Sequence, residues 1–269
     1  MAALQSANIT VMIKAVRKAS GKLKRDYGEV DQLQVSSKGP ADFVTAADVR
    51  TEEMLRDSLS YARPEYGFLL EEAGEIAGED PTRRWIIDPI DGTTNFIHGI
   101  PHFAISVALE ENGEITAGVI YEPVNDQMFW AEKGNGAWLN DRRMRVSGRA
   151  QMNQSIFATG IPFMGRGEKS DHELFLKQME AVMTVSAGIR RFGSAALDMA
   201  YVAAGRFDGF WETGLQPWDI AAGIIMVREA GGMVSELDGR DRMLSTGSIL
   251  AVNPNLHQEL GQILKQAGK

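Results

Sequence analysis

The sequence of 269 residues contains no cysteine. This absence excludes disulfide bonds, zinc sites built from thiolates and cysteine nucleophiles. The sequence also has no apolar run near the roughly 18 residues that a membrane-spanning helix needs. Lys14, Arg17 and Lys18 interrupt the segment in which a secretory signal peptide would carry its apolar core. We therefore expect a cytoplasmic protein with no membrane association.

Positive charge is scarce as well, because 28 Lys and Arg residues face 36 Asp and Glu residues and the formal net charge is −8. This balance disfavours a general nucleic-acid-binding protein. Familiar nucleotide motifs are missing: no P-loop occurs, and Gly134-x-Gly136 lacks the third glycine of a dinucleotide fingerprint. Ile90 stands where an aspartyl-phosphate phosphatase would carry the second aspartate of Asp-x-Asp. These nucleotide-binding and phosphatase classes are set aside.

The composition that is present is ordinary for a globular protein, with 44% apolar and 24% charged residues. We expect one domain over residues 1–269, with a first half at about 1–145 and a second half at about 146–269. Residues 28–40 and 73–84 are polar and predict loops. Hydrophobic periodicity predicts helices at residues 4–25, 45–62, 170–183, 194–205, 218–230 and 255–267, and strands at 68–70, 85–87, 103–109, 115–121, 127–132, 155–159, 207–211, 232–236 and 248–252. Antiparallel strands followed by mixed strands and helices indicate a layered sandwich of the α/β or α+β class.

The strand at Trp85-Ile86-Ile87 runs directly into Asp88 and Asp91. Ligands commonly bind at the carboxyl ends of strands in α/β proteins. Gly92 allows a close backbone approach to a ligand, and Thr93-Thr94 can cap a following helix whose free N–H groups suit a phosphate. Carboxylates for a cation beside N–H groups for an anion favour a metal-phosphate site. The alternative is a strand that simply ends in an Asx-turn.

Three further carboxylates, Asp48, Glu71 and Asp219, each adjoin apolar residues and are expected to be partly buried. Buried carboxylates are costly unless they are paired or bind a metal, and nearby cations are too few to pair with all of them. Ligation by oxygen alone selects Mg²⁺, Mn²⁺ or Ca²⁺. Taken singly, Glu71 could be a surface group, and Asp219 could cap the helix at 218–230.

Taken together, these motifs resemble the inositol monophosphatase family, within the lithium-sensitive, magnesium-dependent sugar phosphatases. The resemblance covers nearly the whole chain. It is carried by Lys38 to Asp48, Glu71-Glu72, Trp85 to Phe96, Trp218 to Gly223 and Glu229 to Gly232. It implies an αβαβα sandwich of the inositol monophosphatase and fructose-1,6-bisphosphatase type, and a homodimer.

The resemblance also implies roles for individual residues. Metal ligands for two or three Mg²⁺ ions, with Mn²⁺ as an alternative, would be Glu71, Asp88, Asp91, Asp219 and the carbonyl of Ile90. Asp48 and Thr93 would orient the attacking water, with Glu71 a further catalytic group, and the N–H groups of Gly92 and Thr93 would hold phosphate oxygens. The substrate hydroxyls would meet Asp91, Gly193, Ser194, Ala195, Glu212 and Asp219. Lys38 matches a lysine of the family's mobile loop under one of two alignments, so its role stays open.

The function implied is hydrolysis of an inositol or related sugar monophosphate by in-line attack of a metal-activated water. Thr94-Asn95-Phe96 resembles the inositol phosphatase branch. The alternatives are fructose 1,6-bisphosphate or 3′-phosphoadenosine 5′-phosphate as substrate, and a regulatory role in RNA processing or transcription, which the charge does not indicate. Arg190 or Arg191 would meet a second phosphate or line a dimer interface, and the interface is preferred.

Overall fold

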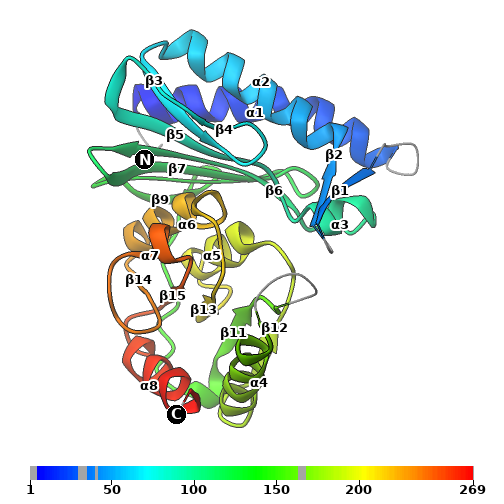
Figure 1. Cartoon of the computed structure of the whole chain (residues 1–269). Coiled ribbons are helices and arrows are strands. Elements are labelled where there is room, and N and C mark those ends of the chain that lie inside the picture. The colour runs from blue at the N-terminus through cyan, green and yellow to red at the C-terminus, as the bar shows by residue number, and fades with distance from the viewer. Residues whose placement is uncertain (1–4, 30–34, 40–41, 163–167, 269) are drawn as a thin grey trace.

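Five layers follow one another across the molecule in the order helix, sheet, helix, sheet, helix (Figure 1). The structure is a computed structural model that describes residues 5–29, 35–39, 42–162 and 168–268. The outer and middle helical layers are α1 (Ala7–Gly28) with α2 (Ala46–Ala62), α5 (Ala195–Ala203) with α6 (Pro217–Glu229), and α4 (Lys169–Met183) with α8 (His257–Ala267). The expected αβαβα sandwich is confirmed.

The large sheet has the strand order β10-β9-β8-β7-β6-β5-β3-β4, and its described strand pairs are antiparallel except for β3 with β5. Trp85 and Ile87 pack in the apolar cluster shared with α1 and α2, while Ile86 packs in the cluster shared with α5 and α6. Both faces are therefore buried, which explains the continuous apolar run on β5. The strands are β3 (Tyr66–Leu70), β4 (Gly74–Ile76), β5 (Asp80–Asp91), β6 (Ala104–Glu111), β7 (Glu114–Glu122), β8 (Gln127–Glu132), β9 (Gly136–Leu139) and β10 (Arg142–Arg143).

The small sheet has the strand order β12-β11-β13-β15-β14, with β11 parallel to both of its neighbours. It lies between the α5–α6 layer and the α4–α8 layer (Figure 1). Its strands are β11 (Ile156–Thr159), β12 (Gly188–Arg190), β13 (Gly209–Glu212), β14 (Met233–Ser235) and β15 (Ile249–Val252). The remaining elements are the ribbon of β1 (Val35–Gly39) and β2 (Asp42–Thr45), the short helices α3 (Thr93–Ile97) and α7 (Met243–Thr246), and a 3₁₀ turn at Met152–Gln154.

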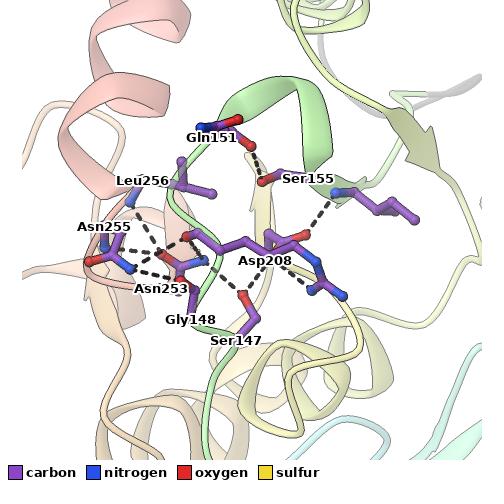
Figure 2. A network of polar contacts seen from close by, with 10 residues as sticks. Ser147, Gly148, Gln151, Ser155, Asp208, Asn253, Asn255 and Leu256 are labelled. Carbon is purple, nitrogen blue, oxygen red and sulfur yellow. Dashed lines mark hydrogen bonds and ion pairs between the residues drawn. The ribbon is translucent and has the colours of Figure 1, made fainter.

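A buried polar network fastens the segment between the two sheets to the small sheet (Figure 2). Asp208, 1% exposed, accepts hydrogen bonds from Ser147 and from Arg149 at 3.1 Å. The amide of Asn253 donates to Ser147 Oγ at 2.9 Å, and its oxygen accepts from the N–H of Leu256 at 3.2 Å. Buried polar groups are tolerated only when they are paired in this way.

Two expected loops are wrong in part. Residues 28–40 include β1, whose Val35 pairs with Thr45 of β2. Residues 73–84 include β4 and the start of β5, because β5 begins at Asp80. The charged start of β5 is held by cross-strand ion pairs, Arg83 with Glu111 at 2.9 Å among them. These segments were predicted as loops because their residues are polar. They form strands because they pair with strands elsewhere in the sequence. In the described residues, no helix is long and apolar enough to cross a membrane.

Candidate active site

Three carboxylates from two elements converge at the carboxyl end of β5. Asp88 and Asp91 end that strand, and Asp219 lies in the first turn of α6. One oxygen from each lies within 4.8 Å of the others. Glu71, directly after β3, lines the same cavity, and its backbone N–H donates to the carbonyl of Ile87 at 3.2 Å. The parallel pairing of β3 with β5 therefore brings Glu71 beside the aspartates.

Burial and the neighbouring carboxylates raise the pKa of Asp88 well above its usual range. The largest cause is burial, since Asp88 is 2% exposed, and the negative charges of Glu71, Asp91 and Asp219 add to it. Burial and neighbouring carboxylates both disfavour the ionised form. Crowded buried carboxylates are stabilised when they are protonated or bind positive charge, and an all-oxygen donor set of this kind fits a hard divalent cation.

Hydrogen bonds orient each aspartate of the cluster. Asp88 Oδ1 accepts from the N–H of Ile90 at 2.9 Å. Asp91 Oδ2 accepts from Ser194 Oγ at 2.5 Å and from the N–H of Ala196 at 2.7 Å. Asp219 Oδ2 accepts from the N–H that begins the capping box of α6, at 2.7 Å. The helix-cap interpretation of Asp219 and its place in the cluster are thus compatible, because the cap uses one oxygen.

The turn after β5 depends on a glycine. Gly92 has φ +97°, and a Cβ there would lie 3.2 Å from the carbonyl oxygens of Gly193 and His102. Only glycine adopts this conformation without strain and permits this approach. Gly92 is also the N-cap residue of α3, so the expectation that Thr93-Thr94 cap the helix with their side chains is wrong. The two threonines follow the N-cap position and lie within the first turn of the helix.

The hydroxyl of Thr93 instead links the turn to α2. Thr93 Oγ1 lies 2.9 Å from the carbonyl oxygen of Ile90 and 3.2 Å from Asp48 Oδ1. Asp48 Oδ2 accepts from the N–H of Thr45 at 2.8 Å and from its hydroxyl at 2.6 Å, in the capping box that begins α2. Burial raises the pKa of Asp48 to about 6, with the charge of Glu72 adding to the effect.

Another part of the cavity lining comes from the second half of the chain. Gly193 and Ser194 precede α5, Ala195 begins it, and Glu212 ends β13. A Cβ on Gly160 would lie 1.9 Å from Glu212 Oε1, so the carboxylate of Glu212 covers the backbone of Gly160. The expected metal, phosphate and hydroxyl-contact residues therefore surround one cavity of about 120 Å³. Asp48 lies behind it and reaches it through Thr93.

Sequence reasoning missed Asp198, which also lines the cavity. It is 1% exposed, its Oδ1 has no hydrogen-bond partner, and its pKa is raised well above the usual range by burial and by the charges of Glu212 and Asp91. The sequence signal for Asp198 was a single acidic residue within the apolar helix Ala195–Ala203.

The sequence left the roles of two arginines open. Arg191 lines the cavity, while Arg190 Nη1 donates to the carbonyl of Ile189. Lys38 lies on β1, but its side chain is outside the part that the structure describes.

Comparisons with known proteins agree with this geometry. The model of the inositol monophosphatase family matches residues 5–269. The chain is 53% identical over 262 residues to the inositol-1-monophosphatase of Mesorhizobium japonicum, covering 97% of each protein. It is 42% identical over 266 residues to the Nus factor SuhB of Salmonella typhimurium, covering 96% of this chain and 98% of that protein. The crystal structure of the extragenic suppressor protein suhB from Bartonella henselae superposes with a TM-score of 0.94 at 53% identity, covering 97% of this chain and 99% of that one.

Proposed function

The chain belongs to the inositol monophosphatase family, and we propose that it is a phosphoric monoester hydrolase that cleaves inositol monophosphate, or a related sugar phosphate, with Mg²⁺. The observation that carries this function is the convergence of Asp88, Asp91 and Asp219 beside the turn at Gly92. A phosphate ester bound to hard cations requires oxygen ligands next to N–H donors. Relatives named inositol-1-monophosphatase support inositol phosphate as the substrate.

The residues proposed to hold two or three Mg²⁺ ions, with Mn²⁺ as an alternative, are Glu71, Asp88, Asp91, Asp219 and the carbonyl of Ile90. Divalent cations bound there would lower the pKa of a water and stabilise negative charge on the leaving oxygen. The hydrogen bonds to the aspartates hold their carboxylates in place before a cation binds.

Asp48 and Thr93 are proposed to orient the attacking water. A threonine hydroxyl has one proton, so its contacts with the Ile90 carbonyl and with Asp48 are alternatives. When Thr93 donates to Asp48, its oxygen can accept a proton from the water. Asp48 is ionised at neutral pH, since its pKa is about 6, so it can take the hydroxyl proton of Thr93 as Thr93 Oγ1 takes a proton from the attacking water.

Two surfaces are proposed to bind the ester. The phosphate turn, Gly92 and Thr93, offers backbone N–H groups to the phosphate oxygens. The sugar wall, Gly193, Ser194, Ala195 and Glu212, lines the same cavity and would meet the hydroxyls of the alcohol together with Asp91 and Asp219. Carboxylates accept hydrogen bonds from a polyol, which an apolar wall does not.

A panel of phosphate esters assayed with Mg²⁺ tests this function. We expect the highest kcat/KM on inositol 1-phosphate, compared with fructose 1,6-bisphosphate and 3′-phosphoadenosine 5′-phosphate. Asp88→Asn and Glu71→Gln should each lower kcat/KM by about 10²- to 10³-fold, the loss typical of removing a charge-stabilising group. Asp57→Asn, on an exposed face of α2, is the matched control and should retain activity. Full turnover in Asp88→Asn would refute the metal assignment.

A homodimer is supported by exposed apolar side chains, among them Leu176, Met183 and Phe192, and light scattering of the purified protein tests it.

Similarity to proteins named Nus factor SuhB makes a binding role beside catalysis the second candidate function. If Asp88→Asn abolishes hydrolysis yet fulfils the cellular role, the binding role is the one that the cell requires.

A further inference from the structure

The phosphate turn and the sugar wall come from opposite halves of the chain, yet their spacing must match the substrate. The turn follows β5 of the large sheet, whereas the wall begins at Gly193, just before α5. A Cβ on Gly92 would lie only 3.2 Å from the carbonyl oxygen of Gly193, so the two backbones are in contact. Because glycine has no side chain, other residues must supply the hydrogen bonds that fix the relative position of these two backbone segments.

Asn95 supplies those bonds. It lies in the middle of α3, two residues after the phosphate turn, and is 6% exposed. Its Nδ2 donates to the carbonyl oxygen of His102 at 2.7 Å and to that of Phe192 at 2.7 Å. Phe192 immediately precedes the sugar wall. One buried amide therefore ties the loop of the first half to the segment that leads into α5.

The surroundings of this amide reinforce the same contact. The rings of His102 and Phe192 pack with their centroids 5.0 Å apart, and a Cβ on Gly193 would lie 3.4 Å from Asn95 Nδ2. Ser194, two residues after Phe192, donates to Asp91. Two residues of the first half thus hold the start of α5, Asn95 through Phe192 and Asp91 through Ser194.

We propose that Asn95 is a positioning residue that fixes the distance between the phosphate turn and the sugar wall, and so sets the preference for phosphate esters of a polyol. This inference rests on the function proposed above. The chemistry explains why the residue is asparagine: one nitrogen carries two N–H donors, one for each of the two carbonyl oxygens. Aspartate has the same shape but would present oxygen to both carbonyls, and alanine would leave both of these acceptors without their present donor.

The experiment compares two esters on the same enzyme. Inositol 1-phosphate uses the sugar wall, whereas p-nitrophenyl phosphate has a leaving group without hydroxyls and depends on the phosphate turn and the metal ligands. In Asn95→Ala, we expect kcat/KM for inositol 1-phosphate to fall by about 10- to 100-fold, mainly through KM, since small displacements of a binding group have effects of this size. For p-nitrophenyl phosphate the fall should stay below about 3-fold.

The matched control is Asn253→Ala, which removes another buried amide with two donated hydrogen bonds, to Ser147 and Arg149, outside the cavity. It should lower the melting temperature and leave the ratio of the two kcat/KM values unchanged. Asn95→Ser, a smaller change, gives the same readout if Asn95→Ala does not fold. An unchanged ratio in the Asn95 variants would overturn the positioning role.

Failure of the proposed function is recognised separately, in the wild type. A wild-type enzyme that is inactive on inositol 1-phosphate but cleaves p-nitrophenyl phosphate would contradict inositol phosphate as the substrate. The role of Asn95 is then measured as the ratio of kcat/KM on glycerol 2-phosphate to that on p-nitrophenyl phosphate, because glycerol also offers hydroxyls to the sugar wall. A fall in that ratio supports the role, and a constant ratio refutes it.

Discussion

At the residue scale, the carboxyl groups of the cavity differ in the way burial and hydrogen bonding treat them. Asp48 accepts two hydrogen bonds from Thr45, and its pKa rises only to about 6. The Oδ1 atom of Asp198 has no such bond, and the pKa of Asp198 is raised well above the usual range. Donors that favour the ionised form offset part of the desolvation. Hydrogen bonding and burial therefore give chemically identical side chains different proton affinities.

Asp48 should produce the acid limb of the pH profile. Its carboxylate accepts a proton only when it is ionised, so kcat/KM should fall as the pH drops through about 6. Bound cations favour the ionised form and shift the limb to lower pH. Asp48→Asn should lower kcat by about 10²- to 10⁴-fold and remove the limb. Rate measurements between about pH 5 and pH 8 at saturating Mg²⁺ test this, and a limb that persists in the variant would contradict it.

Asp198 should make stability depend on pH in the opposite sense from a salt-bridged carboxylate. Its pKa is raised in the folded state, chiefly by burial, so the folded protein binds its proton more tightly than the unfolded chain does. The resulting stability is fully present below the unfolded pKa and is lost as the pH rises towards the folded pKa. Asp198→Asn has no titrating group at this position, so the melting temperature of the variant minus that of the wild type should increase as the pH rises from about 4. Melting curves in chelator measure the difference, and a constant difference would refute this account.

At the element scale, the contact of α6 with β7 places Asp219. Gly118 on β7 leaves no room for a side chain, because a Cβ would lie 2.8 Å from Ile225 Cγ2 and 2.9 Å from Ala222 Cα, both on α6. Trp218, the residue before Asp219, has its carbonyl oxygen 3.4 Å from Ser106 Oγ of β6. The helix thus rests directly on the sheet that carries Asp88, which explains how two distant elements share one cluster.

Gly118→Ala should therefore affect both stability and activity. The added methyl group forces α6 away from the sheet, at a cost of about 1–3 kcal/mol in the free energy of unfolding. Displacing Asp219 should also lower kcat/KM, by up to about 10²-fold. Gly21→Ala in α1 is the control, because nothing lies within 4 Å of its Cβ position, and it should stabilise the protein by about 0.5–1 kcal/mol. Denaturant unfolding and the phosphatase assay measure the two effects. Equal stability of the two variants would contradict the close packing.

At the scale of the whole molecule, the cavity lies between the two halves, so a bound cation should stabilise the entire fold. A ligand that binds only the folded state at 100 times its Kd adds about 2.7 kcal/mol. Mg²⁺ should raise the melting temperature of the wild type and have little effect on Asp88→Asn. In chelator, Asp88→Asn should melt at a higher temperature than the wild type, because the repulsion among Glu71, Asp88, Asp91 and Asp219 is reduced. A Mg²⁺-dependent shift that survives in Asp88→Asn would show that the cation binds elsewhere.

The sequence predicted best those segments whose own pattern of apolar residues indicates burial. The continuous apolar run at Trp85-Ile86-Ile87 predicted a buried strand because both faces of β5 are covered. The apolar periodicity of residues 45–62 likewise predicted a helix, and α2 spans Ala46–Ala62. β1 and the start of β5 were missed, because their residues are polar and their pairing partners lie elsewhere in the chain.

The sequence by itself determined the layered fold, the acidic motif at the end of β5 and, through its order of motifs, the family. These features depend on local periodicity and on residue chemistry, and both can be read from the sequence alone. The tertiary structure alone decided that Arg191 lines the cavity, that Asp198 is buried in its wall and that Asn95 bridges the two halves. A contact between residues about a hundred positions apart leaves no local pattern, because it arises only when the two sheets pack against α5 and α6.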